Sequence, residues 1–494
     1  MKIKVYHVTS FFFLIVFFIF LCSVILCCQE EDFVTVHIAF TQGSESMEDF
    51  DQVLDAINER IREKLQLQLQ IDFIPFGESG MMEYLLKNSH ADLICVSNIK
   101  EKVDRGLLLP LDHLLNEEGS SILEVLSPEY LDLGKVNGSQ YTLIRQIDMA
   151  QSVGICMRKD LVDKYHIDLS AIETWEDFES ILEIVTSGEN AEGTFFGVVP
   201  DLLNPFDTLG DKDILGVLMS PELPMQVVNY YETSEFREWL MRIKEWEKSG
   251  YLYTKKDLHY TKVSARPFLY QQMRAGTLFS YIVKYKPGIA VQESKLCQRE
   301  LVSVKMDTPV MTTDTAAMTQ WGIYAGSNHP KEAMQILNFL YSDSEVINLI
   351  CWGLEGKHYE KNIDGTLSYP EGKTESTIGY HFTNKWLLPN PYLAYVWEGD
   401  DLDLGEKVME FNDTAIRSPA LGFLFDSSSV SAQCEKTYQI TQAYLSGFLC
   451  GAFDVDTMLP NMISDLKEQG SEEIIAEKQR QLDEWYSSFN DSFS

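Results

Sequence analysis

The sequence lacks the short motifs by which common catalytic chemistries are recognised. It contains neither the HExxH pattern of zinc hydrolases nor the GxSxG turn of serine hydrolases, and the GxGxxG and P-loop phosphate motifs are absent. No two of its nine histidines lie close enough to form a helical pair of zinc ligands. Carboxylates are abundant, but no spacing singles out a catalytic pair of the glycosidase kind. We therefore predict a protein that is not an enzyme and that uses no cofactor and no metal ion.

Positive charge is also scarce. The chain of 494 residues has 40 Lys and Arg against 75 Asp and Glu, a formal net charge of −35 at pH 7. Such a surface repels the phosphates of nucleic acid, which excludes nucleic acid as a partner. The acidity suits solubility in a crowded exterior, and a basic ligand is the alternative. With 45% hydrophobic residues, a chain of this length forms two or three cores rather than one.

Cysteine pairs are missing from the body of the chain. Six cysteines follow residue 28, and none of them forms a CxxC motif. Cys95 and Cys156 lie inside apolar, strand-like runs, which favours buried free thiols. A set of disulfides is the alternative, because the count is even and an exported protein forms them readily.

The N-terminus is typical of an export signal. Two early lysines precede the apolar run Phe11–Leu26, whose length also fits a membrane span. The run ends in Ile25-Leu26-Cys27-Cys28 and is followed by acidic residues. This end resembles a bacterial lipobox. The resemblance implies a signal peptide over residues 1–27 and a palmitate-type lipid on Cys28, with Cys27 as the alternative. The protein is then expected at the cell membrane, lipid-anchored on its extracellular face.

Strand and helix patterns alternate in the segment that follows. Periodicity predicts strands and one helix in this order: Val34–Phe40, a helix with apolar residues from 47 to 61, Leu67–Ile74 and Ala91–Val96. A second short helix near Ser79 separates the last two strands. Such an order predicts a parallel α/β sheet. Ligands of these sheets bind outside the carboxyl ends of the strands, which places Gly43–Glu45 and Ser97–Asn98 at the rim of a cleft.

The stretch Met318–Tyr359 carries the most specific pattern of the chain. An apolar strand is followed by a turn at Gly326–Pro330, by a helix with a buried face, and by a second helix that ends at Trp352-Gly353. Periodicity alone indicates packing without chemistry. The stretch also resembles the return strand, helix and WGxEGxHY turn of the ABC-transporter extracellular solute-binding proteins of family 1, and within them the LplA-type sugar-binding lipoproteins.

A second resemblance covers Ser418–Trp485. The sequences SPALGFLFD, GAFDVDTMLPNMISDLKEQG and IIAEKQRQLDEW are similar to the C-terminal domain characteristic of the LplA-type lipoproteins. The chain departs from that pattern at Ser428–Ala432. From the residues alone, the last of these segments reads as a charged helix that docks the C-terminus through a few apolar side chains.

The resemblance implies a fold and a division of the chain. The fold class is α/β of the periplasmic-binding-protein-like type II, with two α/β lobes joined by a hinge and a ligand cleft between them. The expected division is lobe 1 over 33–147 plus 310–350, lobe 2 over 148–309 plus 351–417, and the C-terminal domain over 418–494, packed on lobe 2.

The function implied is that of a membrane-anchored extracellular solute-binding protein. It captures an oligosaccharide and delivers it to the transmembrane subunits of an ABC permease, acting as a monomer. Two alternatives stay open: the same fold binding a peptide or another solute, and an exported glycan-degrading lipoprotein.

Six residues are expected to bind the sugar. Glu45 and Asn98 follow strands, Asp148 lies near the first crossover between lobes, and Trp352 follows the helix beside the crossover. Tyr281 is expected just past a strand of lobe 2, and Trp386 lies in a loop section rich in aromatic residues. Aromatic residues in loops are commonly satellite core. In a chain with this resemblance, however, they suit the flat apolar faces of sugars.

Overall fold

The structure is a computed structural model that describes residues 33–41, 47–75, 78–87, 90–190, 193–202, 206–211, 214–219, 224–253, 265–316 and 319–491. The predicted signal peptide with Cys27 and Cys28, and the predicted rim residue Glu45, lie outside these ranges. Within them, no helix is both long enough and apolar enough to cross a membrane.

The first lobe is built on a five-stranded sheet of order β2-β1-β3-β12-β6. Its strands are β1 (Val34–Thr41), β2 (Leu67–Ile74), β3 (Leu93–Val96), β6 (Thr142–Leu143) and β12 (Gln320–Ile323). β1 pairs in parallel with β2 and β3, as the alternating patterns predict, whereas β12 returns antiparallel to β3 and β6.

Helices cover both faces of this sheet. They are α2 (Phe50–Leu65), α3 (Glu78–Lys87), α14 (Pro330–Leu340) and α15 (Ser344–Trp352). The apolar face predicted for the first of them is buried: Val53, Ile57 and Ile61 are fully inaccessible. α14 begins at Pro330, whose fixed φ suits a first helical turn.

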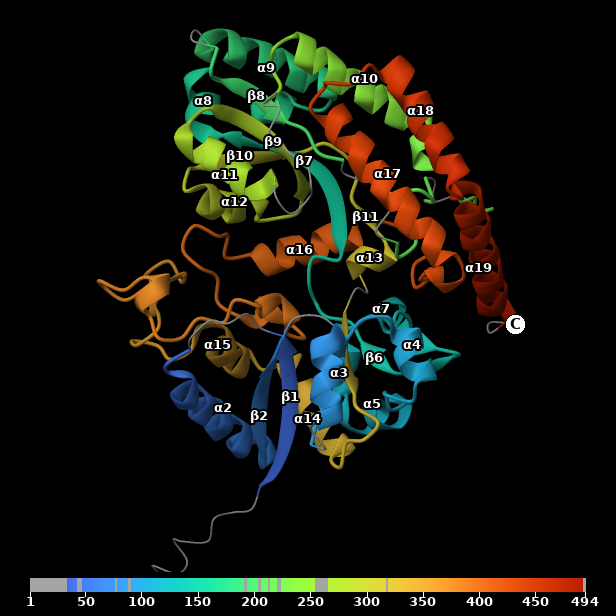
Figure 1. The fold of residues 1–494 in the computed structure, drawn as a ribbon. Helices are drawn as coiled ribbons and strands as arrows, with labels where there is room; N and C mark the ends of the chain where they lie inside the picture. The colour runs from blue at the N-terminus through green and yellow to red at the C-terminus, as the bar shows by residue number, and fades with distance from the viewer. Residues whose placement is uncertain are drawn as a thin grey trace, which may run out of the picture.

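The second lobe has a six-stranded mixed sheet of order β15-β11-β7-β9-β8, with β10 also paired to β7. Its strands are β7 (Ala150–Arg158), β8 (Phe196–Val199), β9 (Leu278–Tyr285), β10 (Leu301–Lys305), β11 (Val310–Met311) and β15 (Ile416–Arg417). The surrounding helices are α8 (Lys159–Lys164), α9 (Trp175–Glu189), α10 (Ser234–Lys248), α11 (Ala265–Ala275) and α12 (Ile289–Cys297). Figure 1 shows this lobe above the first, with α16 (Leu404–Asp413) between them.

The chain crosses between the lobes more than once. One crossing joins β6 to β7, and a second joins β11 to β12 through α13 (Thr313–Ala316). Asn412 of α16 holds the first crossing: its Oδ1 accepts from the backbone N–H of Met149 and Ala150 at 2.9 and 3.0 Å, and its Nδ2 donates to the Ile147 carbonyl at 2.8 Å. Asn412 is fully buried, so α16 is fastened to the hinge by a satisfied polar side chain.

The lobe boundaries differ from the expected ones in two places. β11, expected in lobe 1, pairs with β7 and β15 in the second sheet. Part of segment 351–417, expected in lobe 2, lies in the core of the first lobe, where the rings of Phe40 and Phe382 are 5.4 Å apart. The hydroxyl of Tyr380 donates to the Ile350 carbonyl at 2.7 Å. Apolar residues of a segment expected to form loops therefore complete the core beside β1 and α15.

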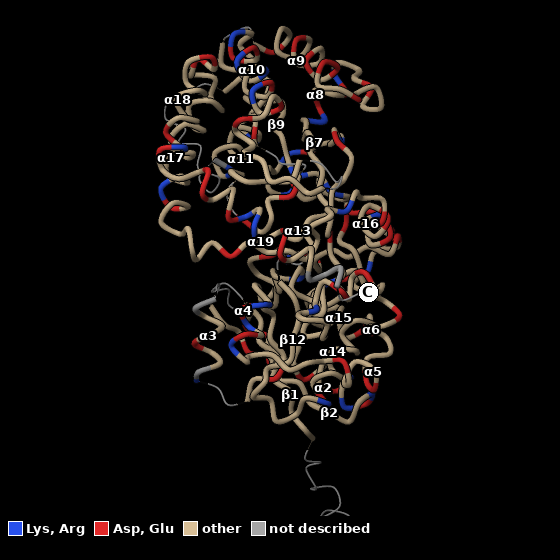
Figure 2. The backbone as a smooth tube through the Cα atoms, turned by 90° about the vertical axis from the view of Figure 1, so that its right-hand side faces the viewer, with Lys and Arg blue, Asp and Glu red and all other residues tan. Residues whose placement is uncertain are grey.

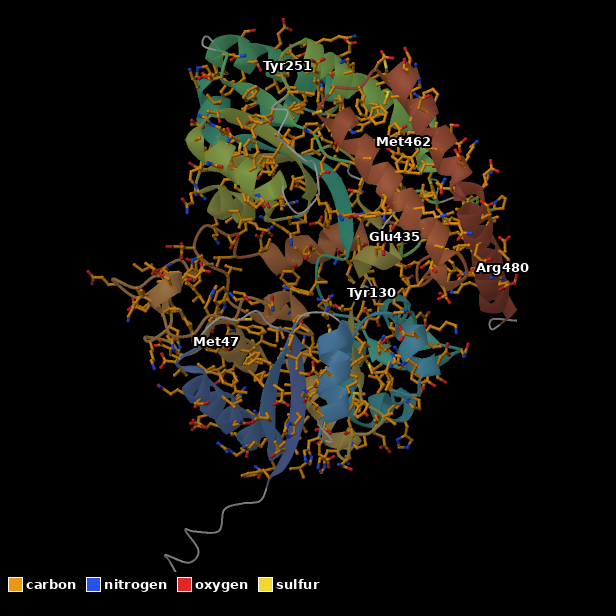
Figure 3. The ribbon with its side chains drawn as sticks, viewed as in Figure 1. Met47, Tyr130, Tyr251, Glu435, Met462 and Arg480 are labelled. Atoms are coloured by element: carbon orange, nitrogen blue, oxygen red, sulfur yellow. The ribbon has the colours of Figure 1, made fainter. Side chains whose placement is uncertain are left out.

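The C-terminal helices pack on the second lobe. They are α17 (Ser431–Leu449), α18 (Val455–Glu468) and α19 (Ser471–Asp491), drawn from orange to red in Figure 1. Phe448, Met462 and Leu466 share a hydrophobic core with Trp246 of α10. Arg480 projects outward from α19 in Figure 3 and pairs with Glu477 and Glu484. Lys, Arg, Asp and Glu occur on helices of both lobes (Figure 2). The predicted docking of the C-terminus is therefore seen in the structure.

The six cysteines of the described chain are free thiols, as their surroundings predict. Cys156, Cys297 and Cys351 are buried, and burial raises the pKa of the Cys351 thiol to about 12. These cysteines act as small apolar core residues.

Candidate ligand-binding site

The carboxyl ends of the parallel strands of the first lobe point toward the second lobe (Figure 1). Asn98 follows β3 there, as predicted, with an exposed side chain and a left-handed backbone at φ 50°. Its Nδ2 donates to Glu101 Oε2 at 3.3 Å. The amide is thus available at the strand end, while Glu45, the other predicted rim residue, is outside the described chain. Sugar binding by both residues stays a prediction.

An aromatic cluster lies at the end of α15. We define it as Trp352, Tyr369, Tyr395 and Trp397. The ring centroids of Trp352 and Trp397 are 5.1 Å apart at an interplanar angle of 31°, and those of Tyr369 and Trp397 are 4.5 Å apart. Trp352 Nε1 donates to the Tyr395 carbonyl at 2.9 Å. Tyr395 is 41% exposed, so the aromatic cluster reaches solvent rather than closing into a core.

The aromatic cluster adjoins the second lobe. Asp400, three residues after Trp397, accepts an ion pair from Lys295 of α12 at 3.3 Å. A Cβ added at Gly399 would lie 3.8 Å from Val291 of the same helix, an ordinary contact distance. The segment that carries the aromatic residues therefore runs from the core of the first lobe to the surface of the second, where a ligand held between lobes has to lie.

Trp352 has a cation on its face. The Lys385 ammonium lies 2.8 Å from the centroid of the Trp352 indole, and the Trp397 ring also packs against Trp352. Desolvation lowers the pKa of Lys385 to about 7, and the π face acts in the opposite direction because it attracts the charged form. The predicted stacking residue is thus at the junction of the lobes, with one face already occupied.

Trp386 is the most exposed of the predicted aromatic residues, at 46%. Its Nε1 donates to Asn384 Oδ1 at 3.2 Å, and the Arg145 guanidinium lies 5.2 Å from its ring centroid. Arg145 itself is buried and donates to the carbonyls of Thr319 (3.0 Å) and Trp386, which joins the first crossing to the aromatic section. Stacking of a sugar on Trp386 stays a prediction.

Asp148 lies in the first crossing between the lobes, as predicted. Its carboxylate pairs with Lys286 Nζ at 3.0 Å, and both side chains are about one-third exposed. Lys286 follows β9 of the second lobe, so this pair spans the hinge. In the ligand-free protein the carboxylate is therefore partly satisfied within the chain.

Tyr281 corrects the predicted site. β9 continues to Tyr285, five residues beyond its expected end, so Tyr281 lies in mid-strand and is only 2% exposed. Its hydroxyl donates to Glu293 of α12 at 2.7 Å, and Glu293 is fully buried. The Tyr281 ring belongs to the core between β9 and α12, which keeps it away from any ligand in this arrangement.

The described residues contain no group of three or more His, Cys, Asp or Glu side chains placed to hold a metal ion. The acidic turn Gly399–Asp403 instead pairs with lysines, since Asp401 and Asp403 both contact Lys407.

Sequence patterns missed the cations of the site. Lys385 begins a short 3-10 helix and Arg145 lies in an irregular segment far away in the sequence, and neither belongs to a motif. Tyr395 and Trp397 were visible only as loop aromatics. The neighbouring residues Lys385 and Trp386 hint at a contact between a cation and an aromatic ring. Nothing in the sequence, however, predicts that this pair lies near Trp352.

A comparison with family models matches residues 419–487 to DUF3502, a domain of unknown function. A search of curated proteins finds a carbohydrate ABC transporter substrate-binding protein of Streptococcus pneumoniae. It is 24% identical over 460 residues, which cover 91% of this chain and 90% of that protein.

Solved structures share the fold of nearly the whole chain. The N-glycan transport solute-binding protein NgtS of S. pneumoniae gives a TM-score of 0.76 at 22% identity, over 91% of this chain and 98% of that one. An HMO-binding, ABC-transporter-associated solute-binding protein of Bifidobacterium longum infantis gives 0.60 at 11% identity, over 92% and 99%. The predicted two-lobed fold and the resemblance to carbohydrate ABC-transporter substrate-binding proteins with this C-terminal domain are thereby confirmed.

Proposed function

We propose that this chain, with its substrate-binding-protein fold and DUF3502 domain, is the oligosaccharide-binding component of an ABC transporter. The observation that carries the proposal is the aromatic cluster at the junction of two lobes. Indole and phenol rings bury the apolar C–H faces of sugars, while neighbouring polar groups bond the hydroxyls. Asn98, Asp148 and Trp386, on the first lobe and its crossing, would supply such groups.

Binding would draw the lobes together. The two crossings beside α16 form a hinge, and domain closure around a ligand is an established response of two-lobed binding proteins. The solved relative NgtS supports this view. Its TM-score to this chain is 0.76 in one structure but 0.66 and 0.61 in complexes with Man1GlcNAc and Man5GlcNAc, with nearly the same coverage. Since the sequence is unchanged, these NgtS structures differ from one another in conformation.

The location follows from the N-terminus. We propose that Cys28 carries the lipid that holds the protein, as a monomer, on the outer face of the cell membrane, next to the permease that receives the sugar. Two acyl chains anchor a protein stably, at about 0.8 kcal/mol per buried methylene. β1 begins at Val34, so a tether of only a few residues separates Cys28 from the first lobe.

The direct test is a binding screen. Thermal melts and calorimetry would be run with Man1GlcNAc, Man5GlcNAc and kestose, sugars bound by solved relatives, and then with an array of oligosaccharides. A ligand that binds only the folded state adds about 2.7 kcal/mol of stability at a hundred times its Kd. Oligopeptides of matched size serve as the control class. Binding of peptides and of no saccharide would contradict the proposal.

A further inference from the structure

The Lys385 side chain is unlike the other lysines that contact aromatic rings. Lys361 lies 4.4 Å from the centroid of Tyr395 and also pairs with Glu355 at 3.0 Å. Lys385 lies much closer to its ring, and in the described part of the chain its ammonium makes neither an ion pair nor a hydrogen bond. Only the indole face of Trp352 compensates its charge at short range.

The nearby acids do not reach Lys385. Asp400 is paired with Lys295, and Glu375 contributes to the pKa of Lys385 only through space. A half-buried ammonium without a carboxylate is unfavourable, because desolvation of the charge is offset only by the attraction of the ring. A packing role alone would be served better by an apolar side chain. The position of this ammonium is understandable if the face of Trp352 also has to receive a ligand.

We propose that Lys385 is a specificity-determining residue of the sugar site, whose ammonium covers the face of Trp352 in the free protein and leaves it when a sugar ring stacks there. The inference rests on the proposed function. It follows from geometry, since a group 2.8 Å from the ring centroid fills the space that a pyranose C–H face would take. Weakly stacking solutes fail to displace the ammonium, so Lys385 selects ligands that cover the indole well.

The proposal predicts that removing the ammonium strengthens binding. Lys385→Ala and Lys385→Gln free the ring from the cation, whose attraction is about 1 kcal/mol, so the Kd should fall by roughly fivefold. Lys385→Arg keeps a cation on the ring and should bind like wild type. Lys373→Ala, a substitution at an exposed lysine of the same section, is the control for lost charge. Each variant would be titrated by calorimetry with Man1GlcNAc, Man5GlcNAc and kestose.

A second readout follows the side chain itself. Acetylation of lysines, measured by mass spectrometry, should increase at Lys385 when a bound oligosaccharide releases it, and stay constant at Lys373. Circular dichroism melts verify that the variants are folded. If Lys385→Ala does not fold, the test uses Lys385→Gln.

The outcomes separate the two proposals. Unchanged or weaker binding by the Ala and Gln variants, or no increase in acetylation, overturns the role of Lys385 while leaving the proposed function intact. Failure of wild type and all variants to bind any saccharide overturns the proposed function and this inference with it. Tighter binding by the Ala and Gln variants but not by the Arg variant supports both.

Discussion

Lys478 links the C-terminal helices to the second lobe through a buried ion pair. It lies on α19, is fully buried, and its ammonium pairs with Asp211 at 2.8 Å and donates to the Gly216 carbonyl at 2.9 Å. Lys478→Met keeps the length of the side chain and removes the charge. The change removes the ion pair with Asp211 and the hydrogen bond to the Gly216 carbonyl.

The expected loss of stability follows from these partners. Removing one member of a buried ion pair costs about 3–5 kcal/mol, and since Asp211 is 20% exposed and can be rehydrated, we expect about 3 kcal/mol. For a unit of this size, that corresponds to a fall in melting temperature of roughly 6–9 °C. Thermal melts followed by circular dichroism measure it, and limited proteolysis should show cleavage near α19 first.

Two further variants make the test specific. Lys436→Met removes an exposed lysine from α17 and should leave the melting temperature within about 1 °C. Asp211→Asn combined with Lys478→Met removes both charges and should recover part of the loss, because no carboxylate remains whose buried ion pair has been broken. If Lys478→Met melts like wild type, the buried pair does not hold the C-terminal helices, and the reasoning is refuted.

Four further predictions address the site, the hinge, one buried carboxyl and the anchor. Trp352→Ala should weaken oligosaccharide binding at least tenfold by calorimetry while a normal melt is kept; a much lower melting temperature would instead show a core role. Saturating sugar should reduce the radius of gyration in small-angle scattering, and an unchanged radius in a confirmed complex would argue against closure. Burial raises the pKa of Asp207 to about 6, so the folded state binds the proton more tightly and stability is lost as pH rises from about 4 to 6; Asp207→Asn should therefore be more stable than wild type at pH 7, by about 3 kcal/mol in urea titrations, with little advantage left at about pH 4. Cys28→Ala should leave an unprocessed precursor or release the protein, as cell fractionation would show, and normal processing would disprove the anchor.

Local patterns anticipated the elements of the first lobe well. The alternation in Val34–Thr41 and the apolar face of Phe50–Leu65 depend on residues close in sequence, and the structure buries those side chains. Thr174 and Asp177, three residues apart, likewise form a capping box at the start of α9. Where the whole pattern lies within one helix or strand, residues close in the sequence determine that element.

The errors arise where the outcome depends on distant partners. Tyr281 was placed beyond the end of β9, but pairing with β7 extends the strand to Tyr285 and turns the tyrosine into the core. Tyr380 and Phe382 read as loop aromatics, yet they close the core over β1. No periodicity encodes such contacts, because the segments that meet are hundreds of residues apart.

The cations with little exposure in this acidic chain fall into two groups, which differ in whether a carboxylate is their partner. Lys478 has Asp211 as its partner, and Arg158 pairs with Asp160 at 2.6 Å; both hold packed elements together inside the second lobe. Arg145 and Lys385 instead lie at the junction of the lobes, where backbone carbonyls and ring faces replace carboxylates. Carboxylates are abundant in this chain, yet neither Arg145 nor Lys385 is paired with one in the described residues. Because hydroxyl groups and ring faces of a sugar can replace carbonyls and ring faces without leaving an ion pair broken, cations placed in this way are compatible with the proposed closure of the lobes around a sugar.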